Sequence, residues 1–184
     1  HKCGAVTQDG KIFYDTLMNN IDLHDENINY DKLKRAVNTA NISNEIEQLM
    51  QGYNTVMGEM GRGLSGGQKQ RILIARALYK NPDFLFFDEA TNSLDTINEQ
   101  KIVNALDDVF KEKTVIVVAH RLSTIRKAHQ IIVIKDGSVA EIGNHESLIA
   151  KKGHYAMLVQ SQFDSPLKTE DNKVSQQEKF ADLL

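Results

Sequence analysis

Residues 64–89 read LSGGQKQRILIARALYKNPDFLFFDE, and this stretch predicts a helix that leads directly into a strand. Ser65 can cap the helix because Gln68 stands three residues later, which is the capping-box pattern. Apolar side chains then recur at helical spacing until Asn81-Pro82 stops the helix. The continuous apolar run at 84–87 predicts a strand buried on both faces of a parallel sheet. A helix followed by such a strand is typical of an α/β fold.

The rest of the chain continues this alternation of helices and strands. Periodicity and turn residues predict strands at 2–7 and 114–119, helices within about 15–57 and at 96–110, and a loop at 58–65. Asp136-Gly137, between apolar residues 131–134 and 139–142, is a strong hairpin signal. Short helices at 146–150 and 155–162 are expected to close the fold, and the polar residues after Phe163 are expected to be disordered.

Composition restricts the class of protein. The 184 residues are 41% hydrophobic and 26% charged, which is ordinary for a globular cytosolic domain. The net charge of -3 gives no basic surplus, so we expect no nucleic-acid partner. The single cysteine, Cys3, excludes a disulfide framework and a zinc site built from cysteines. No apolar run approaches the length of a membrane span.

Polar side chains follow each predicted strand of the parallel sheet. Strands joined by helical crossovers share one carboxyl edge, which is where open α/β sheets bind ligands. At that edge we expect Gln8, Asp88, Glu89 and His120. One carboxylate can hold Mg²⁺ while its neighbour orients a nucleophilic water. Because Ser65-Gly66-Gly67 opens a capped helix, which suits phosphate, the set indicates nucleoside triphosphate chemistry.

Two other interpretations fit the residues less well. Residues 61–66 match the dinucleotide fingerprint G-x-G-x-x-G, and Asp88 lies about twenty residues further on. The fingerprint requires a strand immediately before its first glycine, and residues 51–60 offer only Val56-Met57. It also leaves Glu89, Asp95 and His120 without a role. A metal site built from the cysteine and the histidines is disfavoured because no pair among Cys3, His24, His129, His145 and His154 has ligand spacing on one helix face.

Leu64-Ser65-Gly66-Gly67-Gln68 resembles the signature motif of ATP-binding cassette (ABC) proteins. Four further motifs, before and after it in the sequence, stand in the same order as in that family. These are Thr7-Gln8-Asp9, similar to the Q-loop; residues 84–89, similar to the Walker B strand with its catalytic glutamate; Ser93-Leu94-Asp95, similar to the D-loop; and Ala119-His120-Arg121, similar to the switch-histidine motif. The resemblance covers about residues 1–162. It implies a P-loop NTPase-like α/β cassette with a mostly parallel sheet and a helical subdomain, at about 15–80, that is inserted after the Q-loop and carries the signature motif. Residues 163–184 would form a polar tail.

The subtype also shows in the sequence. Gly58-Glu59-Met60-Gly61 and residues 120–124 are similar to stretches of ABC exporters, among them peptide or bacteriocin exporters that carry a peptidase domain. Members of this class fuse a membrane domain in front of the cassette and work as dimers. The resemblance thus implies two partners, a second nucleotide-binding domain and a transmembrane domain, at the cytoplasmic face of the plasma or inner membrane. The absent membrane domain would choose the transported substrate, which this sequence does not identify.

The resemblance also implies roles in binding ATP and Mg²⁺ and in hydrolysis. Asp88 would hold Mg²⁺ through water, Glu89 would polarise the attacking water, and His120 would contact the γ-phosphate. Gln8 would sense metal and water and link to the membrane domain. Residues that would close over a nucleotide held by the partner subunit, or cross the interface with it, are Leu64, Ser65, Gly66, Gly67, Gln68 and Asp95. Tyr14 and Glu59 would lie near the coupling helices of the membrane domain.

One motif of the family is absent from these 184 residues, namely the Walker A phosphate loop G-x-x-x-x-G-K-[ST]. The one Gly-Lys pair, Gly10-Lys11, is followed by Ile12. In the family this loop precedes the Q-loop, so we expect the N-terminal strands and the P-loop to be missing here and the chain by itself to be inactive. We expect the parent protein to hydrolyse ATP and so drive export. A non-catalytic truncated or regulatory module and a non-transport ABC ATPase remain as alternatives.

Overall fold

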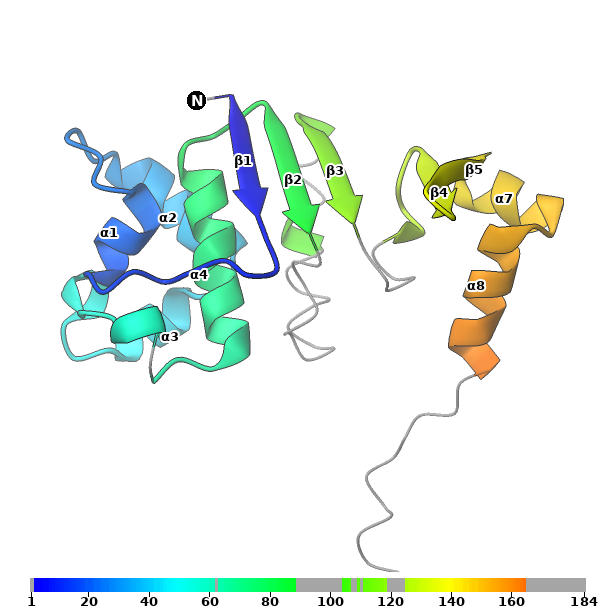
Figure 1. The fold of residues 1–184 in the computed structure, drawn as a ribbon. Coiled ribbons are helices and arrows are strands. Elements are labelled where there is room, and N and C mark those ends of the chain that lie inside the picture. Colours follow the sequence, from blue (N-terminus) through cyan, green and yellow to red (C-terminus); the bar gives the residue numbers. More distant parts are fainter. Residues whose placement is uncertain are drawn as a thin grey trace, which may run out of the picture. The chain divides into compact units, whose positions relative to one another are not determined.

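The computed structural model describes residues 2–61, 63–88, 104–106, 109, 111–118 and 125–164 (Figure 1). The chain divides into two compact units, His1–Thr124 and Ile125–Leu184, which are described separately below. Within the described ranges, no helix combines the length and the apolar character that a membrane span needs. The domain limits expected from the sequence, 1–162 with a tail at 163–184, stay a prediction.

The first unit contains a three-stranded parallel sheet. Its strands are β1 (Cys3–Val6), β2 (Phe84–Asp88) and β3 (Thr114–Val118), in the order β1-β2-β3. Figure 1 shows the three arrows pointing the same way. The parallel strands confirm the α/β prediction made from the apolar runs of the sequence.

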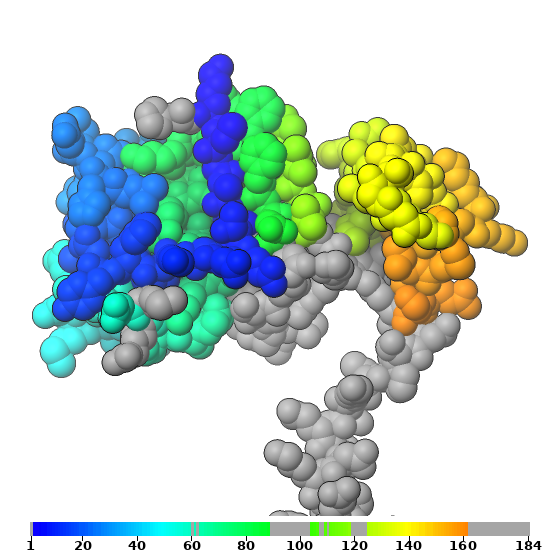
Figure 2. All heavy atoms as spheres, viewed as in Figure 1, coloured from blue at the N-terminus to red at the C-terminus, as the bar shows by residue number. Residues whose placement is uncertain are grey.

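Burial of the sheet differs from the sequence prediction. In β2, Leu85 and Phe87 are buried, whereas Phe84 and Phe86 are 42% and 39% exposed. β3 is exposed along most of its length. The expectation that these strands are buried on both faces is therefore wrong for the described residues. Among the described elements α4 packs against β1, and atoms of β2 reach the surface beside β1 (Figure 2).

Short helices lie between β1 and β2 in the sequence. They are α1 (Leu17–Asp22), α2 (Tyr30–Thr39), α3 (Ser43–Gln48), the 3₁₀ turns η1 (Gly52–Asn54) and η2 (Glu59–Gly61), and α4 (Gly66–Tyr79). Side chains cap the first two of them, because Thr16 accepts from the Asn19 amide and Asn29 accepts from the Lys32 amide. The core that joins α1, α2 and α4 to the sheet includes Val6, Leu17, Ile21, Leu33, Val37, Ile72, Ile74 and Leu85.

The segment before Gly61 excludes the dinucleotide-binding interpretation. Val56 makes only an isolated bridge with Thr16, and the residues that lead into Gly61 form the 3₁₀ turn η2. No strand therefore ends at the first glycine, as the fingerprint requires.

The second unit is a hairpin followed by two helices. Strands β4 (Ile131–Lys135) and β5 (Ser138–Gly143) pair antiparallel around Asp136 and Gly137, which have φ angles of 50° and 74°. Two consecutive residues with positive φ form the type I′ turn that Asp-Gly favours, so the hairpin prediction is confirmed. Helices α7 (His145–Lys151) and α8 (His154–Asp164) follow, where short helices were expected.

Some expected elements fall outside the described residues. Most of the helix predicted at 96–110 does so, although residues 104–106 and 109 are helical. The tail from residue 165 onward is also outside the described part of the chain.

Candidate functional site

The carboxyl edge of the sheet brings two of the expected positions, Gln8 and Asp88, to the same side of this unit. Val6 pairs with Phe87, and Asp88 pairs with Val118, so the three strands end level with one another. Gln8 leaves this edge after β1, and Asp88 is the last residue of β2; both are exposed. Glu89 follows Asp88 directly in the sequence, and His120 stands two residues beyond the end of β3.

Three predicted site residues lie outside the part of the chain that the structure describes. They are Glu89, Asp95 and His120. The strand ends fix where the chain enters the segments that contain Glu89 and His120, and the roles of all three residues stay predictions.

Helix α4 begins with the signature residues and a complete capping box. The Ser65 hydroxyl accepts from the Gln68 amide at 3.2 Å, and the Gln68 Oε1 accepts from the Ser65 amide at 2.9 Å. Ser65 and Gly66 are exposed, while Leu64, Gly67 and Gln68 are partly buried. These bonds fix the first turn and leave the helix start open to a partner.

Helix α4 runs antiparallel to β1, which places its start toward the carboxyl edge of the sheet. Gly4, in β1, lies against the Ala77 carbonyl near the end of the helix, whereas Gly10, beyond β1, lies against Leu73 in its middle. Figure 1 shows the same direction. The signature residues and the strand ends therefore lie toward the same end of this unit.

The segment after Gln8 is fixed by two polar residues, the buried Asn20 and the partly buried Arg76. The Arg76 guanidinium donates to the carbonyls of Lys11 and Asn20 and to the Asn20 side chain. Burial lowers the pKa of Arg76, but an arginine keeps its charge under such a shift. Neither residue was predicted from the sequence. The available signal was a polar residue on an apolar helix face, since Asn20 lies between the buried Leu17 and Ile21.

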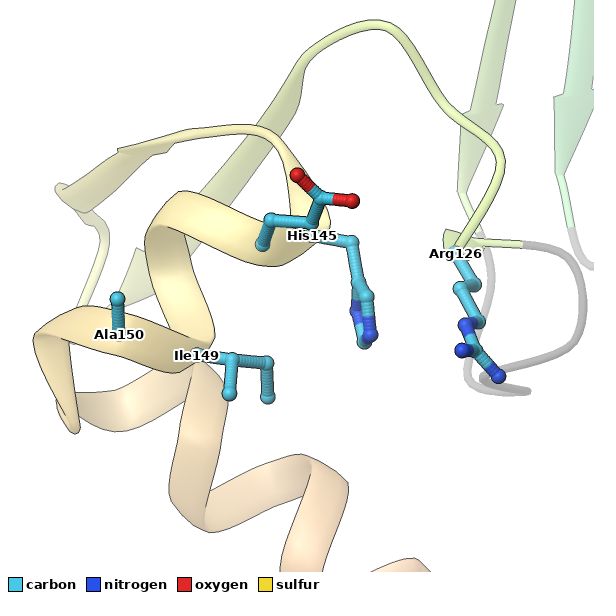
Figure 3. Close-up of a pocket in the computed structure, with 5 residues that line it drawn as sticks. Arg126, His145, Ile149 and Ala150 are labelled. Carbon is cyan, nitrogen blue, oxygen red and sulfur yellow. The ribbon is translucent and has the colours of Figure 1, made fainter.

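Two hollows of the surface lie apart from the predicted site residues. One, of about 480 Å³, belongs to the second unit, and Figure 3 shows His145 and Arg126 on two sides of it. The His145 Nδ1 there is 2.8 Å from the Tyr155 hydroxyl. The other, of about 390 Å³, lies beside α2 and the end of α4. None of the predicted site residues that the structure describes lines either hollow.

Comparison with known proteins assigns the family. Residues 1–92 match the model of the ABC transporter family. The chain belongs to the ABC transporter family. Over 163 residues it is 48% identical to "ABC transporter B family member 13" of Arabidopsis thaliana, covering 89% of this chain and 13% of that protein. Over 160 residues it is 47% identical to an ATP-dependent lipid A-core flippase of Syntrophus aciditrophicus (strain SB), covering 87% of this chain and 27% of that protein.

A solved ABC structure shows the same fold. The chain matches a bacterial Atm1-family ABC exporter with ATP bound at a TM-score of 0.82 and 43% identity, over 88% of this chain and 28% of the exporter chain. The resemblance to an exporter-type ABC cassette and the predicted fold class are thus confirmed. The chain spans between 13% and 28% of the length of these three proteins. None of these three names mentions a peptidase domain, and that subgroup stays a prediction.

Two further ABC positions predicted from the sequence are accessible. Tyr14 is 76% exposed in the segment after Gln8, and Glu59 is exposed in η2. The neighbouring Phe13 is 52% exposed. Their proximity to a membrane domain stays a prediction.

Proposed function

We propose that the chain is part of the ATP-hydrolysing cassette of an ABC exporter. The observation that carries the proposal is the shared carboxyl edge of β1, β2 and β3, from which Gln8 and Asp88 emerge and which Glu89 and His120 follow in the sequence. The membership of the ABC family and the similarity to an exporter with ATP bound support it.

The residues at this edge fit Mg²⁺ held together with ATP. Among the described residues no group of three or more histidine, cysteine, aspartate or glutamate side chains could hold a metal ion by itself. Mg²⁺ does not need such a group, because in nucleotide sites it is held by one or two carboxylates, water and phosphate oxygens. The exposed Asp88 carboxylate can supply that protein ligand through water, and Gln8 follows the adjacent strand at the same edge. Bound Mg²⁺ would neutralise charge on the phosphates.

In this proposal the other residues keep the roles that the family implies. Glu89 accepts a proton from the attacking water, and His120 contacts the γ-phosphate. Residues 64–68 close over a nucleotide held by a second cassette, and Asp95 crosses the same interface. The phosphate loop must come from sequence other than these 184 residues, so the chain by itself does not turn over ATP. The whole protein would export its substrate with its cassettes at the cytoplasmic face of the membrane.

The two aspartates at the ends of β2 provide a matched test. Asp83, directly before the strand, and Asp88, its last residue, are both exposed. In the whole transporter, Asp88→Asn should lower Mg²⁺-dependent ATP hydrolysis by about 100-fold or more, because the metal loses its carboxylate. Asp83→Asn, at the other end of the strand, should hydrolyse ATP like the wild type. The assay measures phosphate release as a function of Mg²⁺ concentration. The 184-residue chain alone serves as a negative control and should release no phosphate.

Equal activity of the two variants would remove Asp88 from the site. A whole protein that binds ATP without hydrolysing it would favour the non-catalytic alternative. Hydrolysis in a protein without a membrane domain would favour a non-transport ATPase.

A further inference from the structure

Arg76, on helix α4, makes all of the described hydrogen bonds of its side chain to the segment that follows Gln8. Its Nε lies 2.6 Å from the Asn20 carbonyl oxygen, its Nη1 lies 2.8 Å from the Lys11 carbonyl oxygen, and its Nη2 lies 2.9 Å from Asn20 Oδ1. The guanidinium also lies over the Phe13 ring, 4.8 Å from its centre. A planar guanidinium with several fixed donors holds its acceptors in one geometry, which a lysine cannot reproduce.

Asn20 extends this contact through the turn between Gln8 and α1. Its side chain is fully buried. Its Nδ2 donates to the carbonyls of Phe13 and Thr16, each at 3.0 Å, and its Oδ1 accepts from the Phe13 amide at 2.8 Å. Two side chains thus hold six backbone groups of residues 11–20, namely the Phe13 amide and the carbonyls of Lys11, Phe13, Asp15, Thr16 and Asn20. We call Asn20 and Arg76 the clamp.

The clamp joins two segments that the proposed mechanism uses. Residues 11–20 begin three positions after Gln8, and α4 begins with the signature residues at Gly66. We propose that Arg76 is a positioning residue, which makes residues 11–20 move with α4 as one body and so couples Gln8 to the signature motif. This inference rests on the proposed function for its catalytic consequence. The rigid connection itself can be measured independently of ATP hydrolysis.

A second arginine of α4 provides the matched control. Arg71 is buried and, like Arg76, makes three polar contacts: Nε with the Gly67 carbonyl at 3.3 Å, Nη1 with the Asn41 carbonyl at 2.7 Å, and Nη2 with Glu45 at 2.6 Å. The contacts with Asn41 and Glu45 tie α4 to the α2–α3 region, and the contact with Gly67 lies within α4. None of these described contacts reaches residues 11–20. Loss of either arginine should lower folding stability, but only loss of Arg76 should free the segment after Gln8.

The kinetic test compares Arg76→Lys with Arg71→Lys in the whole transporter. ATP turnover is divided by the number of sites that trap nucleotide with vanadate, so that misfolded protein does not count. Arg76→Lys should lower kcat by about tenfold, a common size for coupling between sites, and change KM for ATP by less than about twofold. Arg71→Lys should keep kcat within about twofold of the wild type. Adding Asn20→Ala to Arg76→Lys should cause little further loss, because the two residues act as a unit.

A measurement on the unmodified clamp keeps the test valid if Arg76→Lys does not fold. Spin labels at Tyr14→Cys and Lys69→Cys, with the exposed Cys3 replaced by Ser, report the separation of the segment from α4. If the clamp is rigid, the distance between the two labels should have one narrow distribution, and this distribution should be the same without nucleotide and with Mg-ATP and vanadate. A distance that changes between these states, or equal kcat for the two lysine variants, would overturn the inference. If the wild type hydrolyses no ATP, the proposed function fails, and the label distances still decide whether the clamp is rigid.

Discussion

At the scale of single residues, Glu141 joins the hairpin of the second unit to its last described helix. Its two carboxylate oxygens accept from the first amides of α8, Oε1 from His154 at 3.0 Å and Oε2 from Tyr155 at 2.9 Å. These amides have no partner within their own helix, so a carboxylate from another element satisfies them and also complements the helix dipole.

Replacing this carboxylate should destabilise the second unit. In Glu141→Gln one oxygen becomes an amide group that cannot accept, and the remaining bond loses its charge. We expect the free energy of unfolding to fall by about 1–2 kcal/mol. The control, Glu146→Gln, changes an exposed carboxylate of α7 and should stay within about 0.5 kcal/mol. Urea unfolding followed by circular dichroism measures both, and equal losses would show that Glu141 does not cap α8.

At the scale of elements, β1 and α4 are packed so closely that only glycine fits at one position. A Cβ on Gly4 would come within 2.8 Å of the Ala77 carbonyl oxygen, 2.9 Å of Pro82 and 3.0 Å of Leu85. The neighbouring Ala5 points to the other face and is exposed. The contact at Gly4 therefore sets how β1 lies on the helix.

Adding one methyl group at Gly4 should loosen this contact. Gly4→Ala must shift backbone, because a carbonyl stands in the way, and we expect a loss of about 1–3 kcal/mol in unfolding free energy. Ala5→Ser, one position along the same strand, should change it by less than about 0.5 kcal/mol. Chemical denaturation of the two variants gives the comparison. Wild-type stability of Gly4→Ala would mean that β1 and α4 are less tightly packed than the structure shows.

Helix starts and turns with local chemical signals could be predicted from the sequence. The burial of the strands could not. Ser65 with Gln68, and Asp136 with Gly137, specify a helix start and a turn through bonds and angles within a few residues. The burial of Phe84 and Phe86 depends instead on what covers the second face of the sheet, and an apolar run carries no information about that. The contact between Arg76 and Asn20 was not predicted either, because 56 positions separate the two residues and neither belongs to a local motif.

At the scale of the whole molecule, the position of the candidate site follows from topology. Parallel strands that end level place Gln8 and Asp88 at one edge, which the order of strands and helices in the sequence was sufficient to predict. The distances between catalytic groups were not predictable, because in our proposal they depend on the nucleotide and on a second cassette. Our proposal assigns hydrolysis to this edge and nucleotide retention to a phosphate loop outside these residues.

The most direct test is ATP turnover by the whole transporter with Glu89→Gln. This change keeps the size of the side chain and removes the carboxylate that would accept the proton of the attacking water. We predict hydrolysis in the wild type, a loss of at least about 100-fold in the variant, and ATP that stays bound to the variant unhydrolysed. Hydrolysis by Glu89→Gln at the wild-type rate would contradict the assignment of the reaction to this edge of the sheet.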